Sequence, residues 1–221
     1  MAPLVKLKPV DEDPASHFLF ETTQAAALFL RDGIEAVRMT DIAEASGVGV
    51  ATLYRRYKTK TSLAVRAGTY MWQRFNRRIG YAIETDEFLA MNGADRLMML
   101  FEKYIDAYTE HPDFVRFLDE FDHLVLAEGV EPAELARYGE AIDSFYYIFE
   151  DAYRLGRSDG SIGRAVDFPV LYRTVAHAMM GVAQKLVRGE VIPSDDFTHG
   201  KDELMCIVQM ARYTLGINET E

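Results

Sequence analysis

The sequence has only one cysteine, Cys206, so no disulfide bond can form within the chain and the fold needs no oxidising compartment. Cys206 stands between Met205 and Ile207. Two alternatives are open for this side chain, a buried apolar group or a reactive thiol, and we expect the buried group.

Long apolar runs are missing as well. No 18 consecutive residues are apolar enough to cross a bilayer. Near the N-terminus, Leu4 and Val5 are followed by Lys6, Lys8 and three acidic residues at 11–13, which is unlike the apolar core of a signal peptide. We therefore expect a soluble, cytoplasmic protein with no membrane partner.

Signals for β-strands are nearly absent, and helical spacing takes their place. No alternating run of β-branched residues is bounded by an Asn-Gly or Asp-Gly turn. The spacing of apolar residues predicts a first helix over 16–32, which Gly33 ends in a left-handed conformation. The sequence thus predicts an all-α fold.

About nine helices are expected in all. Thr40 is expected to cap the second helix, which ends at a turn over 46–48, and Thr59 to cap the fourth, which runs from Lys60 to the early 80s. The third helix is predicted over 50–57. The other five are predicted near 93–110, 112–127, 132–156, 167–188 and 194–215.

Patterns typical of enzymes are also absent. No nucleophile–base pair, glycine-rich phosphate loop or pair of carboxylates stands at a recognisable spacing. Asp119, Asp122 and His123 have the spacing to face one metal ion, but no second cluster of His or Cys completes a site, and a solvated acidic face is the favoured alternative. The sequence predicts no enzyme activity, no cofactor and no metal.

The net charge of −11 argues at first against nucleic acid as a partner, because phosphate binding needs local positive charge. The charges are unevenly distributed, however. Residues 1–80 carry twelve Lys or Arg and eight Asp or Glu, whereas residues 81–221 carry twelve and twenty-seven. A basic first part and an acidic second part indicate two tasks, and such asymmetry is a hint of nucleic-acid or membrane binding.

Residues 40–57 read TDIAEASGVGVATLYRRY, which predicts a helix, a turn containing glycine and a second helix. Small residues, Ala43 and Gly47, allow the two helices to pack closely, and their small shared core is expected to consist of Ile42, Val48 and Leu53. This arrangement is typical of proteins that hold the second helix in the major groove of DNA.

The second helix of this pair is predicted to have an exposed basic face opposite Leu53. The residues on this face and at its flanks are Ala51, Thr52, Tyr54, Arg55 and Lys58. Arginine pairs bidentately with guanine, hydroxyls suit phosphate oxygens, and Ala51 permits close approach or contact with a thymine methyl group. Lys60 adds a cation at the next helix N-terminus, where backbone amides favour an anion. A merely solvated basic helix is the alternative.

The stretch 16–65 resembles the DNA-binding domain of the tetracycline-repressor (TetR) family of bacterial transcription regulators. The pieces that carry the resemblance are LFLRDG at 28–33, TDIA at 40–43, GV at 47–48, TLY at 52–54, and Lys60 with Leu63. The rest of the chain matches the family only in length and helical character. The resemblance implies nine helices, a homodimer and a ligand-controlled repressor.

The resemblance also implies roles for single residues, with Arg55 reading bases and hydroxyls and Lys60 holding the DNA backbone. The chain departs from the family at Gly49 and Val50, where a serine and a lysine are common, and at Arg56, where an aromatic residue is common. We expect Arg56 to supply the missing charge. The predicted DNA-binding residues are Thr40, Ala51, Thr52, Tyr54, Arg55, Arg56, Lys58 and Lys60.

Twelve aromatic residues lie between positions 97 and 153. Two alternatives are open for them, an ordinary core or a pocket for an apolar or aromatic ligand that tyrosine hydroxyls and a histidine orient. The residues assigned to a candidate effector pocket are Met98, Phe101, Tyr104, Tyr108, Phe117, Phe121, Tyr146, Phe149, His177 and Met180.

The last two predicted helices are rich in small residues and methionine. They form either ordinary packing within the chain or, as the resemblance implies, a four-helix interface between two copies. The expected domains are a flexible tail over 1–15, a helix-turn-helix domain over 16–62 and an effector-binding and dimerisation domain over 63–221.

The leading hypothesis is a homodimeric repressor. Its two reading helices bind double-stranded DNA at a palindromic operator, and a small apolar or aromatic effector favours a dimer geometry that releases the operator. The alternatives are an enzyme that uses the aromatic cavity as its active site and a protein-interaction module whose acidic helices bind another protein.

Overall fold

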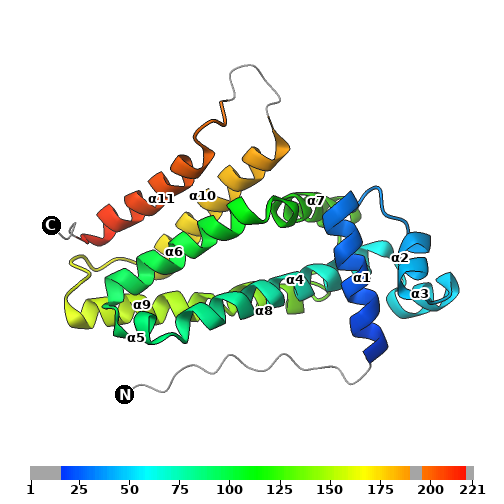
Figure 1. The fold of residues 1–221 in the computed structure, drawn as a ribbon, viewed down its shortest axis with the longest axis horizontal. Helices are drawn as coiled ribbons and strands as arrows, with labels where there is room; N and C mark the ends of the chain where they lie inside the picture. Colours follow the sequence, from blue (N-terminus) through cyan, green and yellow to red (C-terminus); the bar gives the residue numbers. More distant parts are fainter. Residues whose placement is uncertain (1–15, 190–195, 218–221) are drawn as a thin grey trace. The chain divides into compact units, whose positions relative to one another are not determined.

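The computed structural model describes residues 16–189 and 196–217, and within these ranges all regular secondary structure is helical, which confirms the predicted all-α fold. The predicted tail over 1–15 and the start of the last predicted helix lie outside the described residues. The described residues form α1 (Ser16–Asp32), α2 (Met39–Ser46), α3 (Val50–Tyr57), α4 (Lys60–Ile83), α5 (Asp86–Ala90), α6 (Gly93–Glu110), α7 (Pro112–Glu128), α8 (Ala136–Asp143), α9 (Tyr146–Asp159), α10 (Phe168–Arg188) and α11 (Gly200–Leu215) (Figure 1).

The helices fall into two compact units. The first unit comprises the described residues 16–78 and 116–144, and so holds α1 to α3, α8 and most of α4 and α7. A row of aromatic rings runs through its core. Phe29 of α1 stacks on Phe117 of α7 at a centroid distance of 6.3 Å, Phe117 stacks on Phe121, and Phe121 lies 4.6 Å from Tyr138 of α8. These rings join α7 and α8 to the N-terminal helices.

The second unit comprises residues 79–115 and the described residues from 145 onwards, with α5, α6, α9, α10 and α11. Helix α6 packs against α9 and α11, and α10 and α11 run side by side (Figure 1). The crossing of α6 and α9 is very close, because a Cβ atom on Gly93 would overlap the backbone nitrogen of Gly156. Only glycine therefore fits at position 93.

Several predicted helix ends are confirmed. The helices predicted over 16–32, 50–57 and 93–110 have these bounds in the structure. Gly33 follows α1 with a φ of +86°, the left-handed conformation expected of a helix stop. Thr59 caps α4, because its Oγ1 accepts a hydrogen bond of 3.0 Å from the backbone N–H of Ser62.

The helix predicted over 132–156 is wrong, because the structure has a turn and then two helices, α8 and α9, in its place. The break coincides with a side chain from α4. Asn76 Nδ2 donates to the carbonyl oxygen of Ala141 at 2.5 Å and to Ser144 Oγ at 2.6 Å, and Ser144 Oγ also donates to Ala141. These bonds occupy the carbonyl that a continuing helix would use, and helical periodicity contains no sign of a partner 65 residues away.

The expected cap of the second helix is also wrong. Helix α2 begins at Met39 and its N-cap is Arg38, so Thr40 lies inside the first turn. Asp41 closes the cap, because its carboxylate accepts the backbone N–H of Arg38 at 2.8 Å and its guanidinium at 2.9 Å. A carboxylate three residues after the cap thus replaces the expected hydroxyl.

Two smaller differences concern α5 and α11. The short helix α5, which Thr85 caps through its Oγ1 and the N–H of Phe88, was not expected, because five residues are too few to show a period. Cys206 is exposed rather than buried. Helix α11 turns Leu204 and Val208 inward, and Cys206 lies on another side of it.

Candidate nucleic-acid interface

Helices α2 and α3 form the predicted helix–turn–helix. Gly47 ends α2 with a φ of +64°, and the backbone N–H of Val48 donates to the carbonyl oxygen of Ala43 at 3.0 Å, which closes the turn. Ile42 and Leu53 are fully buried between the helices. The miniature core expected from the sequence is therefore present, and it holds α3 by its apolar side.

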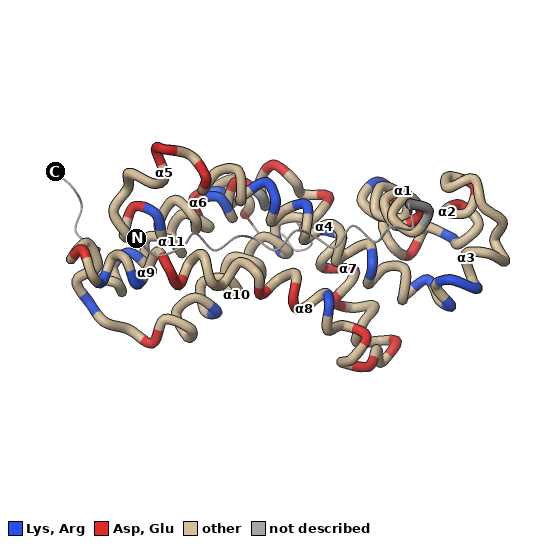
Figure 2. The backbone as a smooth tube through the Cα atoms, turned by 90° about the horizontal axis from the view of Figure 1, so that it is seen from below, with Lys and Arg blue, Asp and Glu red and all other residues tan. Residues whose placement is uncertain are grey.

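The outer side of α3 carries the predicted basic face. Leu53 and Tyr57 are buried, whereas Tyr54, Arg55 and Lys58 are exposed. Figure 2 shows Lys and Arg residues gathered along α3. Ala51 is also exposed, so close approach of a duplex to this helix is unobstructed at that position.

The two predicted phosphate-binding threonines differ in exposure. Thr40 is exposed at the start of α2, with its hydroxyl 3.4 Å from Asp41 Oδ1, and Thr52 is half-buried on α3. Tyr54, two residues after Thr52 on α3, is exposed. The first unit thus presents three hydroxyls from α2 and α3 together with the cations of α3.

Arg56 does not supply the free charge that was expected of it. Its guanidinium forms an ion pair with Glu21 of α1, a carboxylate that is only 1% exposed, and it lies 4.9 Å from the centroid of the Phe18 ring. The neighbouring Tyr57 donates its hydroxyl to the carbonyl oxygen of Phe18 at 3.2 Å. Burial raises the pKa of Tyr57, so this hydroxyl stays protonated at neutral pH. Sequence patterns gave no indication of Glu21.

Lys60 is likewise engaged within the unit. Its Nζ atom donates to the carbonyl oxygens of Ile34, Glu35 and Val37 at 2.8 to 3.1 Å. An ammonium group has three donors, and these three carbonyls use all of them. A direct contact of Lys60 with DNA phosphate requires one of these bonds to break.

The chain reverses sharply between α3 and α4. Lys58 has φ +62° and ψ −51°, and the N–H of Thr59 donates to the carbonyl oxygen of Tyr57 at 2.7 Å, which defines a γ-turn. A residue other than glycine in this region is strained. Among the described residues Lys58 is the one non-glycine with positive φ, and it stands at the end of α3.

The candidate effector residues of the second unit form a packed aromatic cluster. Phe101 and Phe149 lie 5.0 Å apart, Tyr104 and Phe149 5.5 Å apart, and Phe149 and Tyr172 5.1 Å apart between ring centroids. The hydroxyls of Tyr104 and Tyr172 are 3.3 Å apart. Burial raises the pKa of Tyr104 and of Tyr108, so both hydroxyls stay neutral. Sequence reasoning did not single out Tyr172.

The other predicted effector residues are placed differently. Phe117 and Phe121 belong to the ring stack of the first unit, described above. On α10, His177 is exposed rather than buried and Met180 is half-buried. The ten residues therefore do not form one buried lining, and the packed cluster is the part of the prediction that the structure brings together. Met98, on α6 of the same unit, is buried.

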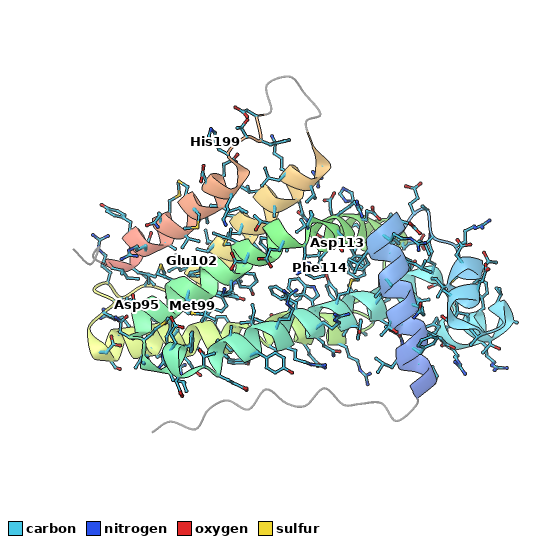
Figure 3. All side chains as sticks on the ribbon, in the orientation of Figure 1. Asp95, Met99, Glu102, Asp113, Phe114 and His199 are labelled. Carbon is cyan, nitrogen blue, oxygen red and sulfur yellow. The ribbon has the colours of Figure 1, made fainter. Side chains whose placement is uncertain are left out.

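Helix α6 separates this cluster from polar surface. Asp95, Met99 and Glu102 follow one another along one side of the helix (Figure 3). Phe101 and Tyr104 on the same helix are buried. The aromatic side of α6 therefore faces the interior of the second unit.

An open surface hollow of about 470 Å³ lies in the first unit and was not expected from the sequence. It is lined by Asp32, Gly33, Glu35, Ala36 and Glu120. Glu120 accepts a hydrogen bond of 2.5 Å from the backbone N–H of Ile34. The hollow is therefore acidic, and an apolar or aromatic ligand is unsuited to it.

The described residues offer neither a cluster of metal ligands nor a membrane-spanning helix. Within the described ranges, no three His, Cys, Asp or Glu side chains are grouped in a way that could hold a metal ion. Nδ1 of His123 instead lies 2.7 Å from the carbonyl oxygen of Asp119. None of the helices in the described part of the chain combines the length and apolar composition that a bilayer crossing requires.

The segment that contains α2 and α3 matches a model of a protein family. Residues 22–67 match the model described as "Bacterial regulatory proteins, tetR family". This segment of the chain is therefore similar to the DNA-binding domain of TetR-family regulators. The chain is a DNA-binding transcriptional regulator, and regulators of the TetR family bind DNA and small-molecule effectors, typically as dimers.

Solved structures of other regulators share the fold of this chain. A putative transcriptional regulator from Saccharomonospora viridis in complex with choline is 20% identical, with a TM-score of 0.65 over 87% of this chain and 95% of that one. The fatty acid degradation regulator FadR from Bacillus halodurans is 14% identical, with a TM-score of 0.63 over 89% and 94%. A TetR regulator from Haloarcula marismortui is 19% identical, with a TM-score of 0.64 over 90% and 96%. No curated protein matches the sequence.

Proposed function

We propose that this regulator is a homodimeric repressor that binds a palindromic operator and leaves it when a small apolar or aromatic effector binds. The observation that carries the proposal is the outer face of α3, where Tyr54, Arg55 and Lys58 are exposed. On the opposite face, the buried side chain of Leu53 packs α3 against the rest of the first unit. Arg55 reads base edges, and the hydroxyls of α2 and α3 hold phosphates. The protein acts in the cytoplasm, where the DNA is.

The aromatic cluster of the second unit is the proposed effector site. Its rings provide the apolar surface, and the paired hydroxyls of Tyr104 and Tyr172 provide the polar groups that orient a ligand. The related folds whose names include choline and fatty acid degradation support an effector of small size. The ligand enters by displacing ring–ring contacts, which links its binding to the arrangement of α6, α9 and α10.

The proposed dimer forms through the outer faces of α10 and α11. Val170 of α10 and Met210 and Tyr213 of α11 are exposed, Tyr213 to 75%, and small residues Ala178 and Gly181 lie exposed on α10. A second copy covers these side chains and removes their apolar area from water. DNA reading is assigned to residues 16–62, and effector binding and dimerisation to residues 63–221.

The DNA side is tested with a duplex that the full-length protein selects from a random pool. Arg55→Ala is expected to weaken binding to this duplex by about 1–3 kcal/mol and to relax base preference. Arg77→Ala, which removes an exposed arginine of α4, is the matched control and leaves binding unchanged. If Arg55→Ala bound both the selected and the random duplex with the affinity of the parent, Arg55 would not read the bases.

The effector side is tested by titrating fatty acids, aromatic acids and choline into the protein–duplex complex and following fluorescence anisotropy. An effector of the proposed class weakens DNA binding about 5- to 150-fold. Tyr104→Phe keeps the ring and removes the buried hydroxyl, so it reduces the response, while Tyr81→Phe on the surface does not. If no apolar or aromatic compound changed the affinity for DNA, release of the operator by such a ligand would be contradicted.

A further inference from the structure

Two successive arginines of α3 have opposite environments. Arg55 is exposed, whereas the side chain of Arg56 is 23% exposed and forms an ion pair with Glu21 of α1. Glu21 itself is 1% exposed. A carboxylate is rarely buried in this way without a partner, because its removal from water is costly unless a partner compensates.

Arg56 is held by more than one contact. Its guanidinium lies over the ring of Phe18 at 4.9 Å from the centroid, and the rings of Phe18 and Tyr57 meet edge to face at 6.2 Å. Tyr57 also donates its hydroxyl to the carbonyl oxygen of Phe18. Arg56 and Tyr57 of α3 thus both contact the same turn of α1, which includes Phe18 and Glu21.

These contacts fix the rotation of α3 about its own axis. Successive helical residues point about 100° apart, so holding Arg56 and Tyr57 against α1 determines where Arg55 and Tyr54 point. Both of these residues are exposed. A small rotation of the helix would move the Arg55 guanidinium away from the base edge that it must meet bidentately.

We propose that Glu21 is a positioning and specificity-determining residue for DNA reading. By holding Arg56 against α1, Glu21 fixes the orientation of α3 in which Arg55 points outward. The same ion pair keeps the guanidinium of Arg56 from binding a DNA phosphate. Glu21 acts through Arg56 and does not touch DNA. The inference rests on the DNA-binding role of the chain and is independent of control by an effector.

The withheld cation matters because contacts with phosphate strengthen binding to every sequence alike. Each phosphate that a Lys or Arg neutralises makes the plot of log K against log[salt] steeper by about 0.9 and raises affinity for random DNA. Release of Arg56 from Glu21 therefore raises the affinity for random duplexes. At the same time, an α3 whose orientation is less firmly fixed loses contacts with the selected duplex. The ratio of the two affinities falls.

The experiment uses the full-length protein without effector. Dissociation constants for the selected duplex and for a scrambled duplex of equal length are measured over about 50 to 300 mM KCl. The variants are Glu21→Gln, which removes the buried charge, and Arg56→Met, which keeps an apolar stem over Phe18. Lys58→Met removes the exposed cation at the end of the same helix and is the matched comparison.

Arg56→Met is expected to keep the parent slope on both duplexes, whereas Lys58→Met flattens it by about 0.9. Glu21→Gln steepens the slope on the scrambled duplex by about 0.9 and lowers the ratio of selected to scrambled affinity several-fold. Flattening by Arg56→Met as large as that by Lys58→Met would place Arg56 on phosphate and overturn the proposal. Parent-like slope and ratio in Glu21→Gln would overturn it as well.

The fold of each variant is checked by circular dichroism. A single variant leaves one buried charge without its partner and can unfold for that reason. In that case the double variant Glu21→Leu/Arg56→Met is used, because replacing both partners with apolar groups often leaves the stability of the protein unchanged. The double variant is expected to have the parent slope on both duplexes. A slope flatter by about 0.9 would show that Arg56 had been a phosphate ligand.

Discussion

The ammonium nitrogen of Lys60 lies 2.8 Å from the carbonyl oxygen of Ile34, although 26 residues separate them in the sequence. The same ammonium group also reaches the carbonyl oxygens of Glu35 and Val37. From α7, Glu120 accepts the N–H of Ile34. The loop between α1 and α2 is therefore held at Ile34 by charged groups on both its carbonyl and its amide.

Lys60→Met is expected to lower the free energy of unfolding by about 1–3 kcal/mol, because it leaves partly buried carbonyl oxygens without their donor. Urea unfolding followed by circular dichroism measures the change. Lys58→Met serves as the control, because Lys58 is exposed and has no such task. Equal midpoints for the two variants would mean that the three bonds add nothing to stability.

Gly33 and Gly47 provide a matched pair of substitutions. Both have positive φ, +86° and +64°, so alanine at either position costs roughly 1–2 kcal/mol of backbone strain. At Gly33 the new Cβ would also lie 2.9 Å from Glu120 Oε1, whereas at Gly47 nothing lies within 4 Å.

Gly33→Ala is therefore expected to destabilise the protein by about 1 kcal/mol more than Gly47→Ala, because Glu120 must withdraw from the N–H of Ile34. Urea unfolding of the two variants measures this difference. In a Glu120→Ala background the difference should disappear, and its persistence there would show that the carboxylate is not the cause.

Asp41 makes the start of α2 sensitive to acid. The hydrogen bond from the Arg38 guanidinium lowers the pKa of Asp41 below its ordinary value. A carboxylate with a lowered folded-state pKa contributes stability above its unfolded-state pKa of about 3.9, and this contribution is lost as the pH falls through the folded-state pKa.

Asp41→Asn is thus expected to unfold at a lower temperature than the parent at neutral pH, and the difference should vanish once the pH is below the lowered folded-state pKa of Asp41. Thermal unfolding at a series of pH values measures it. Glu44→Gln, which removes an exposed carboxylate from the same helix, is measured in parallel as the control. A difference that is constant with pH would mean that the charge of Asp41 is not involved.

Cys206 reports on the proposed dimer because it is exposed on α11 near Met210 in the sequence. Its labelling by a maleimide is expected to slow several-fold as the protein concentration rises through the dimer dissociation constant. Met210→Glu should restore fast labelling, since it places a charge in the apolar interface, whereas Tyr147→Glu on α9 should not. A labelling rate independent of concentration, with a dimer present by sedimentation, would place the interface elsewhere.

Local patterns predicted most of the helices well. The bounds of α1, α3 and α6 and the cap of α4 by Thr59 follow from neighbouring residues, whose spacing and side chains act within one or two turns. The break between α8 and α9 does not, because it depends on Asn76. A helix that ends through a distant side chain has no local stop signal.

The sequence by itself determined that this chain is helical and that α2 and α3 present a basic, hydroxyl-bearing face, because the periodicity of α3 separates Leu53 from Arg55. Tertiary structure alone decided which cations of that region are available. Arg56 and Lys60 are as basic as Arg55 in sequence, but Glu21 engages the first and three carbonyls the second. The physical reason is that a cation already bound to partners within the protein is not available to bind DNA. Those partners come from other helices and loops, and only folding brings them close.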